Sequence, residues 1–186
     1  RSQIPNDVAN LSVCLPIVKD EQDYWDCEIK INQALSALTS NGGGPVHINL
    51  PTCFKTPFDV KTLPSAKYIK TINNSDNLPR LKGNIGVFIG AHKKWTPKET
   101  ENLEAFCEQH SAVVFCDHTS GYRGKHRLLF SLASGQELHD FNISRPDILI
   151  HIGEITGDYF NLGISSESEV WRGNLEGKIR DSFGKL

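Results

Sequence analysis

Short, mostly apolar runs recur through the second half of the sequence and constrain the fold most strongly. They occupy residues 85–89, 112–116 and 147–152. Uninterrupted apolar runs of about strand length are typical of parallel strands that are buried on both faces. A further strand is predicted at residues 169–172.

A helix is predicted between the first two of these runs. Thr96 and Glu99 have the spacing of a capping box, and Pro97 occupies the favoured first helical position. Strands that alternate with helices imply βαβ units, so we expect a Rossmann-like, three-layer α/β domain with a mainly parallel sheet. The buried face of the helix is predicted to contain Leu103, Phe106 and Cys107.

The first third of the chain predicts a helix followed by a strand. The helix begins at Asp20 or Asp23 and ends in the run 41–44, which contains three glycines. A strand follows at 46–50, where apolar and polar residues alternate between two prolines. We interpret this part as a short remnant of another α/β domain. Apolar residues at helical spacing predict one buried stripe: Cys27, Ile31, Ala34, Leu35 and Leu38.

Residues 52–82 are predicted to connect two domains. They contain Pro57, Pro64 and Pro79 and a polar run at 73–77. A connection of this length is uncommon inside one compact domain. We therefore divide the chain into residues 1–56 and residues 57–186.

Composition excludes several classes of partner and site. The net charge of −2 gives no reason to expect nucleic acid, and no apolar run approaches the ~20 residues of a membrane-spanning helix. The five cysteines form no C-x-x-C pair, so neither a disulfide framework nor a zinc site is predicted, and a reducing cytoplasm is expected. The chain begins with Arg1, which suggests a piece of a longer protein.

Ligands of an open parallel sheet bind beyond the carboxyl ends of its strands. Loops are expected there at residues 90–95, 117–127 and 153–158. The second loop is rich in cations and could hold an anion, or it could be a solvated loop that binds nothing. The candidate contacts to a substrate or effector anion are Arg123 first, then Ser120, Lys125 and Arg127.

Other candidate chemistry is weak. The sequence has neither G-x-G-x-x-G after a strand nor G-x-x-x-x-G-K-[ST], so the isolated glycines after strands are interpreted as turn residues. His47 fits a structural role within a strand, and no nucleophile–histidine pair is predicted.

Two groups of motifs resemble thiamine-diphosphate-dependent enzymes. Residues 44–51 read GPVHINLP after a helix with Ile31-Asn32-Gln33-Ala34-Leu35, which resembles the end of the pyrimidine-binding domain of that family. Residues 103–117, Ser120-Gly121-Tyr122-Arg123 and 146–153 resemble the central domain of its menaquinone-pathway branch. The sequence departs from the pattern at His118, where a proline is usual, and at 52–57, where an acidic segment is usual.

The resemblance implies that residues 1–56 end the pyrimidine-binding domain and begin a linker, and that 57–186 form the central domain. The parent would bind thiamine diphosphate and Mg²⁺, decarboxylate a 2-oxo acid such as 2-oxoglutarate, and transfer the product to an acceptor. The family's cofactor-activating glutamate and its G-D-G…N motif would lie in other domains, since Gly157-Asp158-Tyr159 lacks the second glycine. This chain would then contain no catalytic, cofactor-binding or metal-binding residue and would be inactive alone.

The same resemblance implies that the missing N- and C-terminal domains are partners and that the parent is a homodimer or homotetramer. Three alternatives stay open: a related synthase of polysaccharide or acetolactate-type metabolism, a non-catalytic nucleotide-binding module, and a purely structural domain. The missing glycine fingerprint disfavours the nucleotide-binding module.

Overall fold

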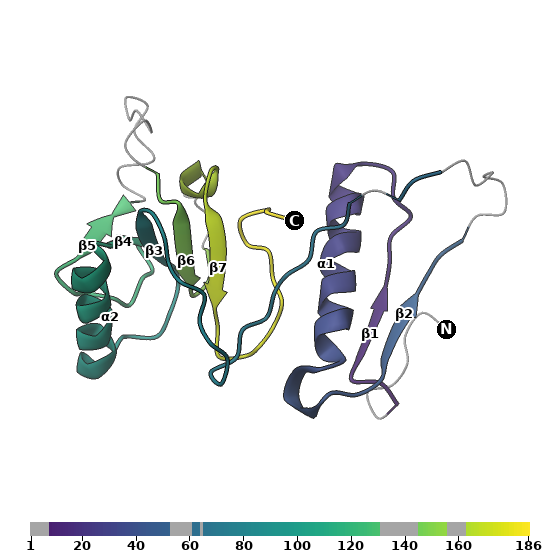
Figure 1. Ribbon diagram of the computed structural model, residues 1–186, viewed down its shortest axis with the longest axis horizontal. Helices are drawn as coiled ribbons and strands as arrows, with labels where there is room; N and C mark the ends of the chain where they lie inside the picture. The colour runs from purple at the N-terminus through teal and green to yellow at the C-terminus, as the bar shows by residue number, and fades with distance from the viewer. Residues whose placement is uncertain (1–7, 53–60, 64, 131–144, 156–162) are drawn as a thin grey trace. The chain divides into compact units, whose positions relative to one another are not determined.

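The computed structural model describes residues 8–52, 61–63, 65–130, 145–155 and 163–186. The chain divides into two compact units (Figure 1). The first contains residues 1–77 with 176–184 and 186, and the second contains residues 78–175 with 185. The predicted division between residues 56 and 57 falls in a segment outside the described residues and stays a prediction.

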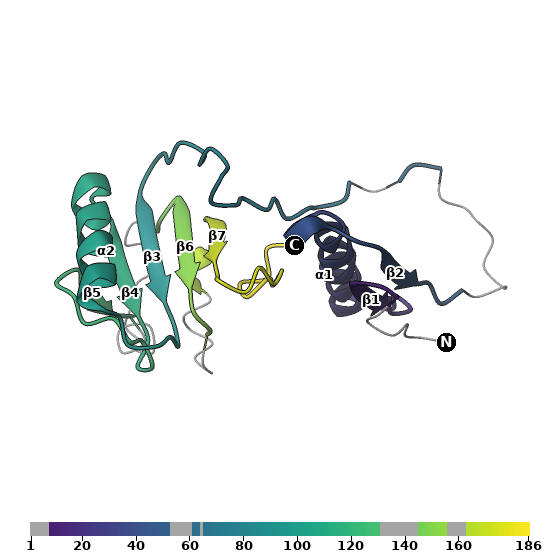
Figure 2. The same ribbon diagram turned by 90° about the horizontal axis from the view of Figure 1, so that it is seen from below.

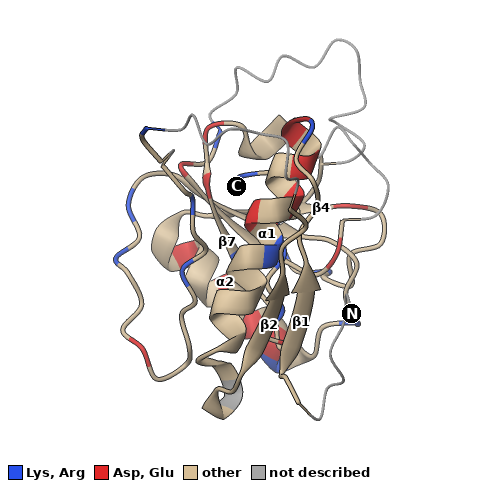
Figure 3. Ribbon diagram, turned by 90° about the vertical axis from the view of Figure 1, so that its right-hand side faces the viewer, with Lys and Arg blue, Asp and Glu red and all other residues tan. Residues whose placement is uncertain are grey.

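The first unit is a strand, a helix and a strand. Strands β1 (Leu11–Cys14) and β2 (Val46–Asn49) are parallel, and helix α1 (Glu21–Ala37) connects them. Figure 3 shows the two strands side by side with α1 on one face. The predicted helix and strand are confirmed, but β1 was missed. Its only sequence signal is the alternation of Leu11, Val13 and Leu15, which is short enough to be overlooked.

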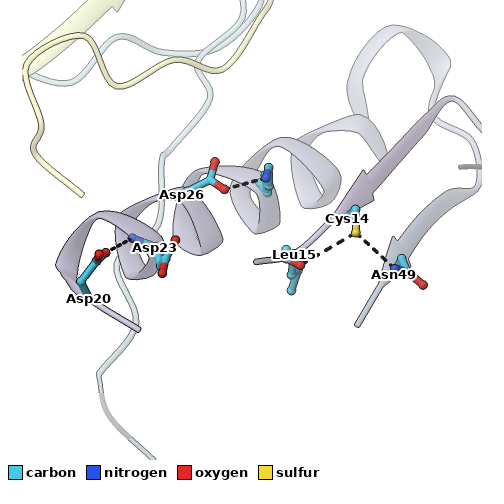
Figure 4. A network of polar contacts seen from close by, with 7 residues as sticks. Cys14, Leu15, Asp20, Asp23, Asp26 and Asn49 are labelled. Atoms are coloured by element: carbon cyan, nitrogen blue, oxygen red, sulfur yellow. Dashed lines mark hydrogen bonds and ion pairs between the residues drawn. The ribbon is translucent and has the colours of Figure 1, made fainter. Parts of the chain in front are cut away.

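The α1 helix begins where the sequence predicted. The Asp20 carboxylate accepts a hydrogen bond from Asp23 N at 2.9 Å (Figure 4). This contact satisfies one of the free N–H groups of the first turn. After the helix, Gly43 has a φ of 74°, a left-handed conformation that costs glycine little.

The predicted apolar stripe of α1 is correct in part. Cys27, Ile31 and Ala34 pack with β1 and β2 in one hydrophobic cluster. The prediction is wrong for Leu35 and Leu38, which are 54% and 43% exposed. The polar side chains of Glu28 and Asn32 are buried instead. The cause is the segment that follows β2 in the chain, which packs against these residues: Asn32 Oδ1 accepts from Ile69 N at 2.6 Å, and Asn32 Nδ2 donates to the Lys67 carbonyl at 3.3 Å.

Polar residues face away from α1 on the two strands. Ser12 Oγ and His47 Nδ1 are 2.9 Å apart, and Asn49 Nδ2 donates to Cys14 Sγ at 3.2 Å (Figure 4). Both pairs are direct cross-strand neighbours in the register. His47 thus has the structural environment that its place in a strand predicted.

The second unit contains a five-stranded sheet in the order β5-β4-β3-β6-β7, and every pair is parallel. This is the order of a Rossmann fold, with β3 as the first strand. Figure 2 shows β3, β6 and β7 side by side, pointing the same way. The predicted Rossmann-like α/β fold is confirmed. The strands are β3 (Ile85–Ile89), β4 (Val113–Cys116), β5 (Arg127–Leu129), β6 (Ile148–Ile152) and β7 (Glu169–Gly173).

Helix α2 (Pro97–His110) covers one face of this sheet, and its predicted capping box is present. Thr96 N donates to Glu99 Oε2 at 2.7 Å, and Glu99 N donates to Thr96 Oγ1 at 3.2 Å. The helix buries Leu103 and Cys107 as predicted, with Phe106 half-buried beside them. The third layer of the predicted fold, which would cover the other face of the sheet, stays a prediction. The core under α2 consists of Ile85, Val87, Ile89, Leu103, Cys107, Ala112, Val114, Cys116 and Tyr122.

Candidate functional site: the carboxyl edge of the sheet

The strand order reverses at β3. The chain passes from β3 through β4 to β5 on one side, and then returns to β6 on the other side. In open α/β sheets, ligands bind in the crevice at such a switch point, just beyond the carboxyl ends of the strands. The described loops at this edge follow β3, β4 and β6, as the sequence predicted. This edge is therefore the candidate site.

The main chain itself bridges the switch point. Ala91 N donates to the Glu154 carbonyl at 2.7 Å, and Glu154 N donates to the Ala91 carbonyl at 3.0 Å. Gly90 N also donates to the Ile152 carbonyl at 3.0 Å. Ala91 forms a second isolated bridge with Ser120 from the loop after β4. The N–H groups of Ala91 and Glu154 are thus used inside the fold and are not available to a diphosphate.

Glycines make this closure possible. A Cβ on Gly90 would stand 2.1 Å from the Glu154 carbonyl oxygen, and one on Gly121 would stand 2.4 Å from the Lys93 carbonyl oxygen. Gly153 has a φ of 84° and would clash with the Ala91 carbonyl at 2.5 Å. These glycines serve close backbone approach, which agrees with their interpretation as turn residues.

Arg172 on β7 clamps the loop after β6. Its Nη2 forms an ion pair with Glu154 Oε1 at 2.7 Å, and its Nη1 donates to the Gly153 carbonyl at 3.2 Å. Its Nη1 also lies 3.2 Å from His151 Nδ1. Because a guanidinium can only donate, His151 Nδ1 is the acceptor in this contact, and the proton of the neutral ring is on Nε2.

His151 is a buried, neutral imidazole in the centre of the sheet. Burial and the neighbouring Arg172 cation lower its pKa to about 4. Its ring meets Phe88 edge-on, with centroids 5.7 Å apart. Sequence reasoning missed both His151 and Arg172. The available signal was a histidine inside an apolar strand, but only the register places Arg172 beside it.

Two of the predicted anion contacts lie in the turn after β4. Ser120 is 1% exposed; its Oγ donates to Cys116 Sγ at 3.4 Å and accepts from Tyr122 N at 3.3 Å. Arg123 is exposed, and its Nη1 donates to the carbonyls of Ser120 at 2.8 Å and Tyr122 at 3.2 Å. Arg123 and Ser120 are therefore brought together through the main chain, with the Ser120 hydroxyl facing inward.

The other two predicted contacts lie elsewhere. Lys125 N donates to Glu104 Oε1 at 3.0 Å, and its Nζ pairs with Glu108, so the residue is bound to α2. This pair raises the pKa of Lys125 and lowers that of Glu108. Arg127 is half-buried in β5, which begins inside the predicted loop. Whether any of the four residues binds an anion stays a prediction.

The described donor atoms do not fit a magnesium–diphosphate group. Within the described ranges, no three His, Cys, Asp or Glu residues are grouped as metal ligands. Gly157 and Asp158, the nearest match to a diphosphate motif, lie outside the described residues.

Among the helices of the described residues, none combines the length and the apolar character needed to cross a membrane.

Comparison with known proteins agrees with the predicted resemblance. A stretch of 65 residues, 33% of this chain, is 43% identical to 2-succinyl-5-enolpyruvyl-6-hydroxy-3-cyclohexene-1-carboxylate synthase of Phocaeicola vulgatus. The synthases of the same name from Bacteroides thetaiotaomicron and Bacteroides fragilis are 41% and 39% identical over 59 residues. No family model matches the chain.

These matches are partial. The aligned stretch spans 11% of the length of each of these synthases. Over this stretch the resemblance to a thiamine-diphosphate-dependent synthase is confirmed.

Proposed function

We propose that this chain is part of a thiamine-diphosphate-dependent enzyme that decarboxylates a 2-oxo acid and transfers the product to an acceptor. The 2-oxo acid is of the 2-oxoglutarate type, and the pathway is menaquinone biosynthesis. The observation that carries the proposal is the 43% identity to a synthase of that pathway. The parallel sheet in Rossmann order supports it independently.

The chain's own role is that of a scaffold. The Ala91–Glu154 bridge uses the switch-point amides, which argues against a bound nucleotide in the second unit. Thiamine diphosphate with Mg²⁺ would supply the carbanion chemistry of the parent enzyme. The residues that activate and hold this group are proposed to lie in flanking domains, so the isolated chain is expected to be inactive.

Arg123 is the proposed contact for a substrate or effector carboxylate. Its Nη1 is held by two carbonyls of its own turn, which fixes the guanidinium while the residue stays exposed. A planar guanidinium can bind a carboxylate with two hydrogen bonds. Ser120, Lys125 and Arg127 would act behind it: Ser120 would shape the turn, and the two cations, held at α2 and in β5, would add positive charge only from outside the turn.

Two experiments test this function. The open reading frame that contains this sequence should encode a glutamate-bearing domain upstream and a G-D-G…N motif downstream, and their absence would remove the proposal. The protein expressed from that frame should release CO₂ from 2-oxoglutarate only with thiamine diphosphate and Mg²⁺. In that protein, Arg123→Ala should raise KM or weaken the binding of an effector, and Arg80→Ala, at another exposed arginine, should change neither.

We further propose that the parent enzyme is a homodimer or homotetramer.

A further inference from the structure

Arg145 is a half-buried arginine that directly precedes Pro146 and strand β6. Its Nε is shielded from solvent and makes no hydrogen bond to a described residue. None of the ion pairs among the described residues includes it. By contrast, the guanidinium of Arg172, whose side chain is 13% exposed, pairs with Glu154. A shielded guanidinium N–H without an acceptor is unfavourable, so Arg145 offers a donor and a positive charge that a ligand could satisfy.

The residue opposite Arg145 is Ser166, in the turn before β7. Arg145 Nη1 donates to Ser166 Oγ at 2.5 Å. Ser165 and Ser168 of the same turn are 1% and 7% exposed, whereas Ser166 is exposed. Because Ser166 Oγ accepts from the guanidinium, its own O–H can be donated to a ligand.

The turn is fixed against the start of β6. Ser168 Oγ donates to the Pro146 carbonyl at 2.5 Å, next to Arg145 in the chain. A second cation contacts the same turn, since Lys185 Nζ donates to the Ser166 carbonyl at 3.0 Å. Glu169 is the first residue of β7. Its carboxylate accepts a hydrogen bond from Trp171 Nε1 at 2.7 Å, so it is engaged by its own strand. The turn therefore presents a hydroxyl donor between two cations.

We propose that Arg145 and Ser166 form a binding site for a phosphate-class oxyanion, with Lys185 as the second positive charge. A tetrahedral dianion can accept from a guanidinium, a hydroxyl and an ammonium group at once. The site is separate from the loops at the carboxyl edge of the sheet, and it does not depend on the function proposed above.

The test is a titration of the ¹⁵N-labelled 186-residue chain with inorganic phosphate, at an ionic strength held constant with sodium chloride. We expect saturable shifts of the Ser166 and Glu167 amide signals. A parallel titration with glycerol phosphate distinguishes the sources. Comparable shifts mean that the phosphoryl group itself is recognised, whether free or on a larger ligand. Shifts with inorganic phosphate alone limit the site to the free ion.

The variants separate a site from general attraction of anions. Arg145→Gln should weaken phosphate binding by about tenfold or more, because one charge-assisted contact is lost. Ser166→Ala, at an exposed position, should weaken it less and keeps the test valid if Arg145→Gln does not fold. Arg80→Gln should leave binding unchanged. The proposal is wrong if the wild-type shifts do not saturate, or if Ser166→Ala and Arg145→Gln both bind phosphate like the wild type.

Discussion

The carbonyl oxygen of Glu154 lies 2.1 Å from the point where a Cβ of residue 90 would stand, so only glycine fits at Gly90. This close approach lets Ala91 and Glu154 exchange their two main-chain hydrogen bonds across the switch point. A side chain at residue 90 would have to push the loop after β6 away. The closed edge of the sheet thus depends on glycine at residue 90, which has no side chain.

Gly90→Ala should lower the free energy of unfolding by about 2 kcal/mol or more, because the clash is with backbone rather than with a movable side chain. Gly163→Ala is the matched control, since nothing lies within 4 Å of its added Cβ. Urea unfolding followed by circular dichroism measures both. Equal stability of the two variants would contradict the proposed closure.

His151 should make stability depend on pH. Its pKa falls from the ordinary 6.5 to about 4 in the folded chain, so between these values the unfolded state binds more protons. Stability is therefore complete above 6.5 and decreases as the pH falls toward 4, by up to about 1.4 kcal/mol per pH unit. Unfolding free energies across this window should fall more steeply for the wild type than for His151→Gln.

Other groups titrate in the same range, so the difference between the two slopes is the informative quantity. Parallel slopes would show that His151 is not held neutral. If His151→Gln does not fold, an NMR titration of the His151 ring in the wild type gives the same answer, and a pKa near 6.5 would contradict the prediction.

Asn32 should hold the connecting segment, residues 65–77, against α1. Its side chain binds the main chain of Lys67 and Ile69, and Asn32→Ala would leave both groups without this partner, at a cost of about 2 kcal/mol. We expect trypsin to cleave at Lys67 and Lys70 faster in Asn32→Ala than in the wild type. Asn74→Ala, in an exposed turn, should digest like the wild type. Unchanged cleavage in Asn32→Ala would mean that the contact does not order the connector.

The cysteines should differ sharply in reactivity. Cys14 is exposed, whereas burial raises the pKa of Cys107 to about 11, which disfavours the reactive thiolate. With a thiol reagent such as dithionitrobenzoate, Cys14→Ser should remove a fast phase that Cys107→Ser leaves intact. Fast labelling that disappears in Cys107→Ser instead would show that the α2 side of the sheet opens readily.

Sequence patterns predicted the elements whose signal is local. The apolar runs of β3, β4 and β6 and the capping box of Thr96 and Glu99 each span only a few consecutive residues. Short-range chemistry therefore determines each of them. Strand β5 was missed because Arg127 follows a charged loop and the strand has three residues. Its pairing with β4 is a tertiary effect that propensity does not contain.

The candidate site was predictable in position but not in detail. The rule for parallel sheets placed the loops at the carboxyl edge, and the structure has them there. The main-chain bridge at Ala91 depends on how two distant loops approach, which side-chain patterns do not encode. Similarly, Lys125 looked available for an anion, but Glu108 on α2 binds it from 17 residues away. The burial of Glu28 and Asn32 followed from a connector whose path the sequence did not reveal.

We propose that this chain is a scaffold whose switch point is closed and that the cofactor chemistry of the parent enzyme lies in other domains. Isothermal titration calorimetry of the chain with NAD, and separately with thiamine diphosphate and Mg²⁺, tests it most directly. We expect no saturable heat with either ligand. A micromolar Kd for NAD would contradict the closed switch point, and a micromolar Kd for thiamine diphosphate would contradict the assignment of its binding residues to flanking domains.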